Sequence, residues 1–212
     1  MTDAFLFDGP SDAPVTVLLA HGAGGAMDSA GMAALTGGLA GAGLRVARFE
    51  FAYMAGRRSG AGRKPPPRAE RLMDEYREAV AALGAKGPLV IGGKSMGGRV
   101  ASMVADSLHA EGRIAGLLCL GYPFHPPGRP EQLRTAHLET LKTPALICQG
   151  SRDPFGTREE VMGYRLSAAI TIAWFEDGDH DLKPRKAVSG FTLSDHMQRL
   201  GAVVTAWAEG LA

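Results

Sequence analysis

Near its middle the chain reads Val90-Ile91-Gly92-Gly93-Lys94-Ser95-Met96-Gly97-Gly98-Arg99. An apolar run at 88–91 precedes the serine, and a helix-competent segment at 100–109 follows it. A serine between two glycines at a strand-to-helix turn indicates a nucleophile elbow, whose strained turn lifts the hydroxyl above the sheet and points a helix N-terminus at the reacting atom. Side chains at Gly93 and Gly97 would clash with the strand and the helix. The alternative is a glycine-rich turn without a catalytic role, because the chain has 29 glycines in 212 residues.

Composition places the chain among ordinary globular proteins, with 45% hydrophobic and 21% charged residues. This length predicts a single domain over 1–212. The formal net charge of +1 gives no reason to expect a nucleic-acid partner. We also expect no membrane association and a cytoplasmic location, because no targeting segment and no apolar run of about 18 residues is visible. Both cysteines, Cys119 and Cys148, lie in apolar runs, which favours two buried thiols over a disulfide or a metal site.

Strand-like and helix-like segments alternate along the chain. The apolar runs are near-continuous rather than alternating, as in strands that are covered on both faces. Expected strands are 15–20, 44–51, 88–91, 114–120, 145–148 and 170–175, with 5–7 as a further edge strand; expected helices are 32–42, 69–83, 100–111, 131–141, 158–169 and 195–209. The alternation predicts the α/β fold class: a mostly parallel sheet of six to seven strands with helices on both faces.

Two segments interrupt this alternation, at 52–68 and at 123–134. Both follow strands, so both should emerge at the C-terminal edge of the sheet, where open α/β folds bind ligands. Arg57 and Arg58 in the first segment and His125 in the second are candidate substrate contacts. The alternative for the basic segment is a solvated loop. The stretch between 120 and 145 is too short for a cap domain with its own core.

A glycine-rich segment after the strand at 15–20 predicts an oxyanion hole. It reads His21-Gly22-Ala23-Gly24-Gly25. The N–H groups of Ala23 and of Met96 would stabilise the negative oxygen of a tetrahedral intermediate, and Gly22 is a candidate substrate contact. The alternative is a turn that binds nothing. A phosphate loop is not favoured, because the G-x-x-x-x-G-K-[ST] spacing is absent.

Two polar residues that follow later strands complete a predicted triad with Ser95. Asp153 follows the strand at 145–148 and could hold a histidine tautomer, although it could also serve only to initiate the turn before Pro154. His180 follows the strand at 170–175 and is the candidate general base. We expect Asp153, rather than Asp177 or Asp179, to be the acid, because the latter two share a tight turn with His180.

The other histidines are weaker candidates for the general base than His180. His109, His137 and His196 fall on expected helices and should face solvent, whereas His21 should support the oxyanion turn. A zinc site built from His180 and its neighbouring aspartates is an open but less favoured alternative, because no second histidine stands at a ligand spacing. We therefore expect no metal and no cofactor.

The chain resembles a family of small bacterial α/β-hydrolase-like proteins that also includes testis-expressed protein thirty and the hydrolase-like part of NSL-complex subunit three. The matching stretches are His21-Gly22-Ala23-Gly24, Gly93-Lys94-Ser95-Met96-Gly97-Gly98-Arg99, Gln149-Gly150-Ser151-Arg152-Asp153 with Phe155-Gly156, and Gly178-Asp179-His180-Asp181-Leu182. The resemblance implies the α/β-hydrolase fold and the triad over nearly the whole chain. A broader resemblance is to dienelactone-hydrolase-like proteins, which carry cysteine where Ser95 stands.

These observations predict a serine hydrolase acting on a small ester or thioester, including an anionic one, through an acyl-enzyme. Because the family also contains assembly subunits, the alternative is a scaffold or ligand-binding protein on the same fold. A peptidase using the same chemistry is a further alternative. The sequence does not specify the oligomeric state.

Overall fold

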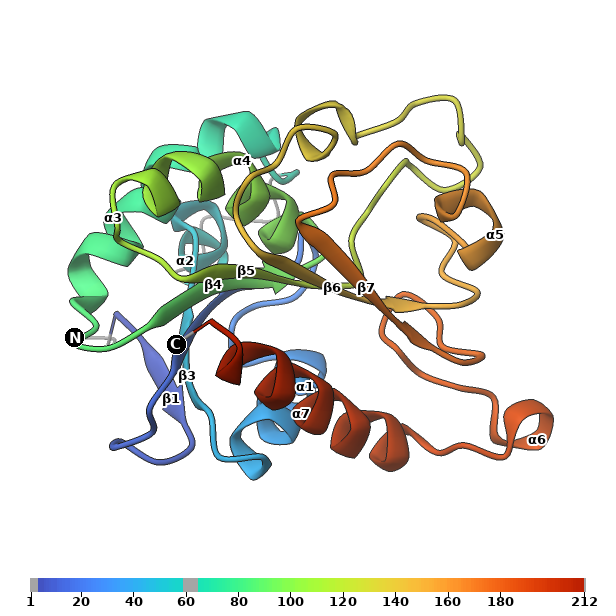
Figure 1. Cartoon of the computed structure of the whole chain (residues 1–212), viewed down its shortest axis with the longest axis horizontal. Coiled ribbons are helices and arrows are strands. Elements are labelled where there is room, and N and C mark those ends of the chain that lie inside the picture. Colours follow the sequence, from blue (N-terminus) through green and yellow to red (C-terminus); the bar gives the residue numbers. More distant parts are fainter. Residues whose placement is uncertain (1–3, 59–64, 212) are drawn as a thin grey trace.

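The computed structural model describes residues 4–58 and 65–211. A seven-stranded sheet crosses the centre of the molecule in the order β1-β3-β2-β4-β5-β6-β7 (Figure 1). Its strands are β1 (Leu6–Asp8), β2 (Thr16–Ala20), β3 (Arg45–Phe49), β4 (Leu89–Lys94), β5 (Gly116–Leu120), β6 (Ala145–Gly150) and β7 (Ile170–Phe175). All neighbouring strands are parallel except β1, which pairs antiparallel with β3. The expected mostly parallel sheet, with a short N-terminal edge strand, is confirmed.

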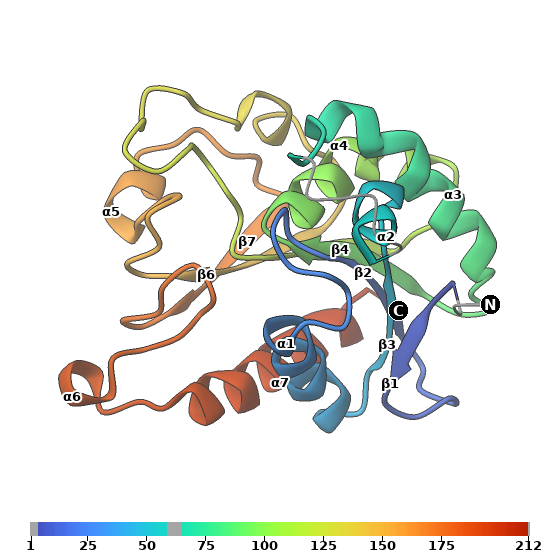
Figure 2. The ribbon, with the colours of Figure 1, turned by 180° about the vertical axis from the view of Figure 1, so that it is seen from behind.

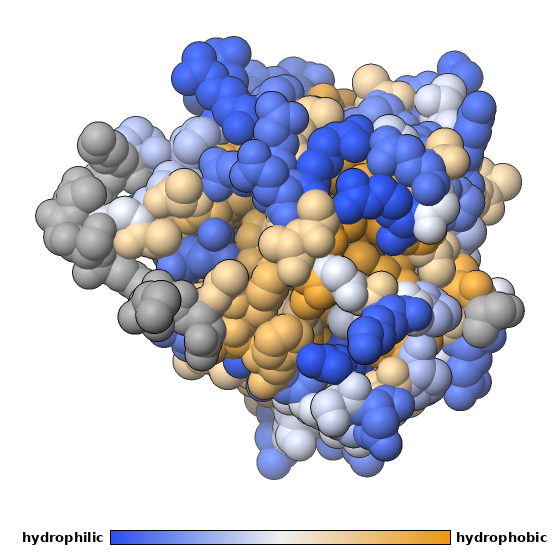
Figure 3. Space-filling view, turned by 90° about the vertical axis from the view of Figure 1, so that its left-hand side faces the viewer, coloured by the Kyte–Doolittle hydropathy of each residue, from blue (hydrophilic) through white to orange (hydrophobic). Residues whose placement is uncertain are grey.

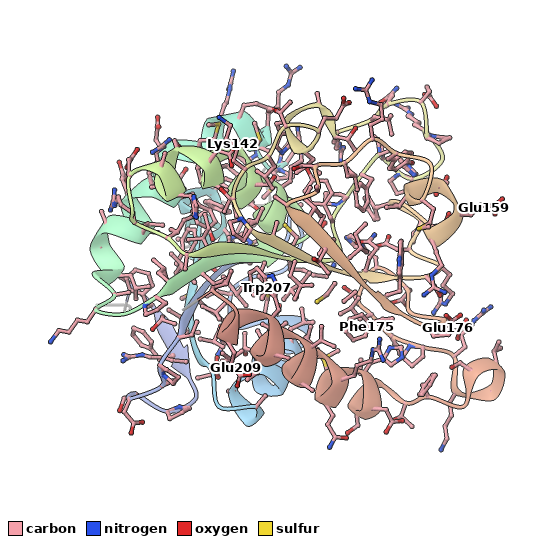
Figure 4. All side chains as sticks on the ribbon, in the orientation of Figure 1. Lys142, Glu159, Phe175, Glu176, Trp207 and Glu209 are labelled. Carbon is pink, nitrogen blue, oxygen red and sulfur yellow. The ribbon has the colours of Figure 1, made fainter. Side chains whose placement is uncertain are left out.

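Helices cover both faces of this sheet. The helices α3 (Met73–Leu83) and α4 (Met96–Ala110) lie on one face, whereas α1 (Ala30–Gly41) and α7 (Leu193–Glu209) lie side by side on the other (Figures 1 and 2). Trp207 of α7 points into the space between that helix and the sheet (Figure 4). Every residue of β4, β5 and β6 is buried, as expected for strands covered on both faces.

Two glycines allow α1 and α7 to approach closely. A Cβ atom on Gly201 would lie 2.3 Å from the carbonyl oxygen of Gly38, and one on Gly38 would lie 2.6 Å from that of Met197. Any larger residue at either position would push the two helices apart. The contact fixes α7 against the sheet and so positions the chain that leads to it from β7.

Four segments differ from the sequence-based expectation. The segment 131–141 is not an α-helix but holds only the 3-10 turn η2 (Ala136–Leu138). Its path is set by Arg134, whose N–H donates to the carbonyl of Phe124 and whose carbonyl accepts from the hydroxyl of Tyr122. The segment 158–169 holds only the short helix α5 (Arg158–Val161), which ends near Gly163. The segment 52–68, expected as a loop, begins with α2 (Ala52–Arg58). The segment 69–83 begins with the 3-10 turn η1 (Ala69–Leu72).

The chain between β5 and β6 contains no cap domain; it runs over the sheet edge as turns and η2. After β7 a short helix, α6 (Lys186–Ser189), leads to α7. Glu159 of α5 and Glu176, the residue after β7, lie at the same end of the molecule (Figure 4). This is the end at which the parallel strands terminate, and it is therefore the end expected to carry a ligand site.

The opposite edge of the sheet is formed by β1. On that face of the molecule, apolar side chains gather across the centre between hydrophilic ones (Figure 3). Phe7 of β1 is half-exposed, and the guanidinium of Arg45 lies 4.8 Å from the centre of its ring. Among the helices that the structure describes, none combines the length and the apolar character required to span a bilayer.

Candidate active site

Ser95 occupies a strained turn between β4 and α4. Its φ of 51° and ψ of −115° lie outside the regions that residues other than glycine normally adopt. Its N–H donates to the carbonyl of Leu120 in β5 at 3.0 Å. A Cβ atom on Gly93 would lie 2.6 Å from the carbonyl oxygen of Ala20, and one on Gly97 would lie 2.5 Å from the same oxygen. The expected steric need for both flanking glycines is confirmed.

The glycine requirement at the elbow gives a stability prediction. Gly97→Ala should lower the free energy of unfolding by about 1–3 kcal/mol, because its methyl group meets backbone atoms that cannot rotate away. The matched control is Gly37→Ala in α1, where an added Cβ has nothing within 4 Å and should stabilise the helix by about 0.5–1 kcal/mol. Urea unfolding of both variants measures the difference. A Gly97→Ala protein as stable as the wild type would contradict the tight packing.

Three side chains from different strand ends form a hydrogen-bonded chain. Nε2 of His180 lies 2.8 Å from Oγ of Ser95, and Nδ1 of His180 lies 2.8 Å from Oδ2 of Asp153. Ser95 follows β4, Asp153 follows β6 and His180 follows β7. The structure thus brings together the three residues that sequence reasoning grouped, with the distances that a serine–histidine–aspartate relay needs.

Asp153 is fully buried, and its carboxylate accepts from several donors. Oδ2 accepts from Nε2 of Gln149 at 2.9 Å as well as from His180, and Oδ1 accepts from the N–H of Phe155 at 2.8 Å. A buried carboxylate with this many donors is held in one orientation. The ring of Phe155 stacks on that of His180 at a centroid distance of 4.1 Å. The sequence analysis assigned no role to Gln149 or Phe155, although both lie in the stretch around Asp153 that carries the family resemblance.

The two aspartates closer in sequence to His180 have other partners. Asp177 accepts from the N–H and the guanidinium of Arg185, which holds the pKa of its carboxyl below the ordinary value. Oδ1 of Asp179 accepts from the N–H groups of Asp181 and Lys183, and its Oδ2 lies 3.4 Å from the guanidinium of Arg152. Both carboxylates therefore organise the turn that presents His180 and do not bind its ring.

The segment that carries Ala23 is held by a buried histidine. Nδ1 of His21 donates to the carbonyl of Gly22 at 2.7 Å, and its Nε2 accepts from the N–H of Phe51 at 3.2 Å. These two partners require a neutral ring. This supporting position agrees with the interpretation of His21. The N–H groups of Ala23 and Met96 donate to no other residue in the described part of the chain.

Two cavities meet at Ser95. The first, which we call the histidine cavity, has a volume of about 290 Å³, and the second, the arginine cavity, has a volume of about 570 Å³. Ser95, Ala23 and Phe155 line both. The histidine cavity is also lined by Gly22, Gly24, Gly25, Ser29, Gly31, Met32, Leu35, Lys94, His180 and Asp181; the arginine cavity is also lined by Pro66, Pro67, Arg68, Ala69, Glu70, Met96, Arg99, Pro123 and Arg134.

Lys94 places a cation beside the hydrogen-bonded chain. Its side chain is largely buried, and its Nζ lies 3.3 Å from Oδ1 of the exposed Asp181. Burial lowers the pKa of this ammonium group, while the charge of Asp181 opposes that shift. Lys94 and Asp181 therefore place an ion pair at the wall of the histidine cavity.

Two of the remaining expected substrate contacts, Arg57 and His125, lie outside both cavities. The guanidinium of Arg57 lies 5.3 Å from the ring centre of Tyr53 in α2, and Arg57 lines neither cavity at Ser95. The side chain of Arg58 lies outside the described residues. His125 is buried, with Nδ1 2.9 Å from the carbonyl of Pro126 and Nε2 3.4 Å from Glu160, and it too lines neither cavity. This placement gives no support to a substrate contact from His125.

The expectation that three further histidines face solvent is wrong for two of them. His196 is buried, and its Nδ1 donates to the carbonyl of Leu182. His137 is half-buried and lies 2.8 Å from Oγ of Ser102, and burial lowers the pKa of its ring. This second serine–histidine pair is a poorer candidate for a nucleophile and its general base than Ser95 and His180. Ser102 lies inside α4, donates its own hydroxyl hydrogen to the carbonyl of Arg99, and lines neither cavity.

Comparisons with known proteins agree with this architecture. A family model described as an alpha/beta hydrolase domain matches residues 13–209. The structure is similar to dienelactone hydrolase from Anabaena variabilis, with a TM-score of 0.71 and 18% identity over 97% of this chain and 90% of that one. It is also similar to an α/β serine hydrolase without a lid from Xanthomonas campestris, with a TM-score of 0.67 and 21% identity over 96% and 88% of the two chains. A third similar structure is Est1E from Butyrivibrio proteoclasticus, with a TM-score of 0.66 and 13% identity over 97% and 94%.

Proposed function

We propose, from the premise that this chain belongs to the alpha/beta hydrolase domain family, that it is a serine hydrolase of small esters or thioesters. The observation that carries the proposal is the hydrogen-bonded chain from Ser95 through His180 to Asp153, which opens into two cavities. Family membership supports hydrolase chemistry in general.

In the proposed reaction Oγ of Ser95 attacks the carbonyl carbon while Nε2 of His180 takes its proton. Asp153 holds Nδ1–H of the ring and stabilises the imidazolium that forms. The N–H groups of Ala23 and Met96, which have no partner among the described residues, receive the developing oxyanion. His180 then protonates the leaving alcohol or thiol. Water attacks the acyl-enzyme through the same histidine, and the carboxylic acid leaves.

The competing function is a scaffold that keeps the fold without the chemistry. The strain at Ser95 argues against it, because a backbone conformation that costs about 1–3 kcal/mol persists only where its surroundings enforce it, and such sites are enriched where chemistry occurs. A scaffold gains nothing from holding a serine in that conformation beside a histidine.

Labelling with a fluorophosphonate separates these two functions without knowledge of the substrate. The probe should modify the wild-type protein at one residue, and mass spectrometry of the digest should assign it to Ser95. Ser102, which also contacts a histidine but lies buried within α4, should remain unmodified. A protein that stays unlabelled at Ser95 while folded would favour the scaffold.

A further inference from the structure

The arginine cavity carries more positive than negative charge. Among the described residues, its lining includes Arg68, Arg99 and Arg134 and a single carboxylate, that of Glu70. Glu70 is bound to Arg99 at 2.8 Å. Arg134 forms no ion pair with any residue in the described part of the chain. A half-buried guanidinium without a carboxylate is an uncommon arrangement, because guanidinium groups taken out of water normally acquire a partner.

The position of Arg134 is fixed by its backbone. Its N–H donates to the carbonyl of Phe124 at 2.7 Å, and its carbonyl accepts from the hydroxyl of Tyr122 at 3.0 Å. Both partners are fully buried aromatic residues. Burial, with the nearby charge of Arg99, lowers the pKa of Arg134. Arg99 and Arg134 thus line the same cavity with like charges, of which that of Arg99 has a carboxylate partner, so an anion in this cavity would complement the charge of Arg134.

The two cavities differ in which part of an ester they can receive. His180 lines only the histidine cavity, and it must protonate the leaving group, so the alcohol portion belongs on that side. Met96, whose N–H is a proposed oxyanion donor, lines only the arginine cavity. The acyl portion, which remains bound to Ser95, therefore extends into the arginine cavity.

We propose that the arginine cavity is a subsite for an anionic group on the acyl portion of the substrate, held by Arg134 and Arg99. This inference rests on the proposed function. The substrate class is a monoester of a dicarboxylic acid, whose free carboxylate accepts paired N–H donors from a guanidinium. Attack by Ser95 releases the alcohol with the proton from His180 and leaves the acyl-enzyme with its carboxylate in the arginine cavity. Water then releases the dicarboxylate and a proton.

The test compares two matched esters: the 4-nitrophenyl monoester of adipic acid and the same compound with its free carboxyl methylated. The measured quantity is the ratio of kcat/KM for the acid to kcat/KM for its methyl ester. Arg134→Gln should lower this ratio about tenfold to a hundredfold, the range expected for a lost charge-assisted contact. Arg134→Lys, which keeps the charge but not the paired donors, should restore part of the ratio.

Arg129→Gln is the matched control, because Arg129 is an exposed arginine of the same segment that does not line the arginine cavity. This variant should keep the wild-type ratio. Sodium chloride should lower the ratio in the wild-type protein through screening, which tests the charge without any substitution. A second pair of acetate esters, with the carboxylate or its methyl ester on the phenol, should show no such preference.

In one outcome, the protein turns over both adipate esters with a ratio of kcat/KM values that neither Arg134→Gln nor salt changes. That result would overturn the subsite and leave the proposed function standing. A preference confined to the phenol-side carboxylate would also overturn it, by reversing the orientation. Absence of turnover together with absence of fluorophosphonate labelling would overturn the proposed function and this inference with it.

Discussion

Ser95→Ala should lower kcat/KM toward a small ester by about a thousandfold or more, because it removes the oxygen that forms the acyl-enzyme in the proposed reaction. Fluorophosphonate labelling should disappear with it. The free energy of unfolding should change little, because alanine keeps the Cβ and loses only the 2.8 Å hydrogen bond to His180. Steady-state kinetics and urea unfolding on the same preparation measure both effects.

A second substitution at this position separates chemistry from strain. Ser95→Gly should be as inactive as Ser95→Ala but more stable than it, because glycine adopts a φ of 51° without strain. The expected gain relative to alanine is about 1–3 kcal/mol. Residual activity near the wild-type level in either variant would show that another residue is the nucleophile.

The sequence predicted the elbow well because its signal is local. Four glycines around one serine, an apolar run before it and a helix after it all lie within about twenty residues. The steric reason for Gly93 and Gly97 needs no knowledge of the rest of the chain. The strands were equally predictable, because β4, β5 and β6 are buried on both faces and their apolar runs are continuous.

The errors share a different cause. The segment 131–141 has helical composition, but the hydrogen bonds of Arg134 to Phe124 and Tyr122 decide its path, and these partners lie outside the segment. His196 lies on a helix as expected, yet its ring meets the carbonyl of Leu182 and is buried. Tertiary contacts of this kind override local propensity and leave no periodic signal in the sequence.

The basic side chains illustrate the same limit at the site itself. Composition drew attention to the arginine-rich segment 52–68, but composition does not say where a side chain points. Arg57 packs over Tyr53, whereas Arg99 and Arg134, from α4 and from the chain between β5 and β6, line the cavity at Ser95. Arg99 lies four positions after Ser95, which is about one helical turn, and this spacing could have placed Arg99 near the elbow. No sequence signal pointed to Arg134.

Asp153→Asn should lower kcat by about four orders of magnitude, and the reason lies in the donors that surround its carboxylate. An amide has one oxygen and one NH₂ group. With its oxygen toward the N–H of Phe155, its NH₂ meets Nε2 of Gln149 and Nδ1 of His180. His180 can accept from that NH₂ only in the tautomer that carries its hydrogen on Nε2. That tautomer cannot take the proton of Ser95.

Turning over the side-chain amide of Gln149 cannot relieve its contact with the NH₂ group of an asparagine at position 153. Its Oε1 accepts from the N–H of Tyr122 at 2.7 Å, and its Nε2 donates to the carbonyl of Gly156 at 3.2 Å, so reversing Gln149 would break both bonds. Asp153→Asn should therefore also lose about 1–3 kcal/mol of unfolding free energy, because donors face each other in a fully buried position.

Asp179→Asn is the matched comparison, because Asp179 is adjacent to His180 in sequence but does not bind its ring. The loss of its charge weakens the contact to Arg152 and leaves the tautomer of His180 unchanged, so kcat should fall by less than about tenfold. Kinetics of both variants with one ester, each checked for folding by circular dichroism, give the ranking. A larger loss in Asp179→Asn than in Asp153→Asn would assign the orienting carboxylate to the turn itself and would remove Asp153 from the proposed triad.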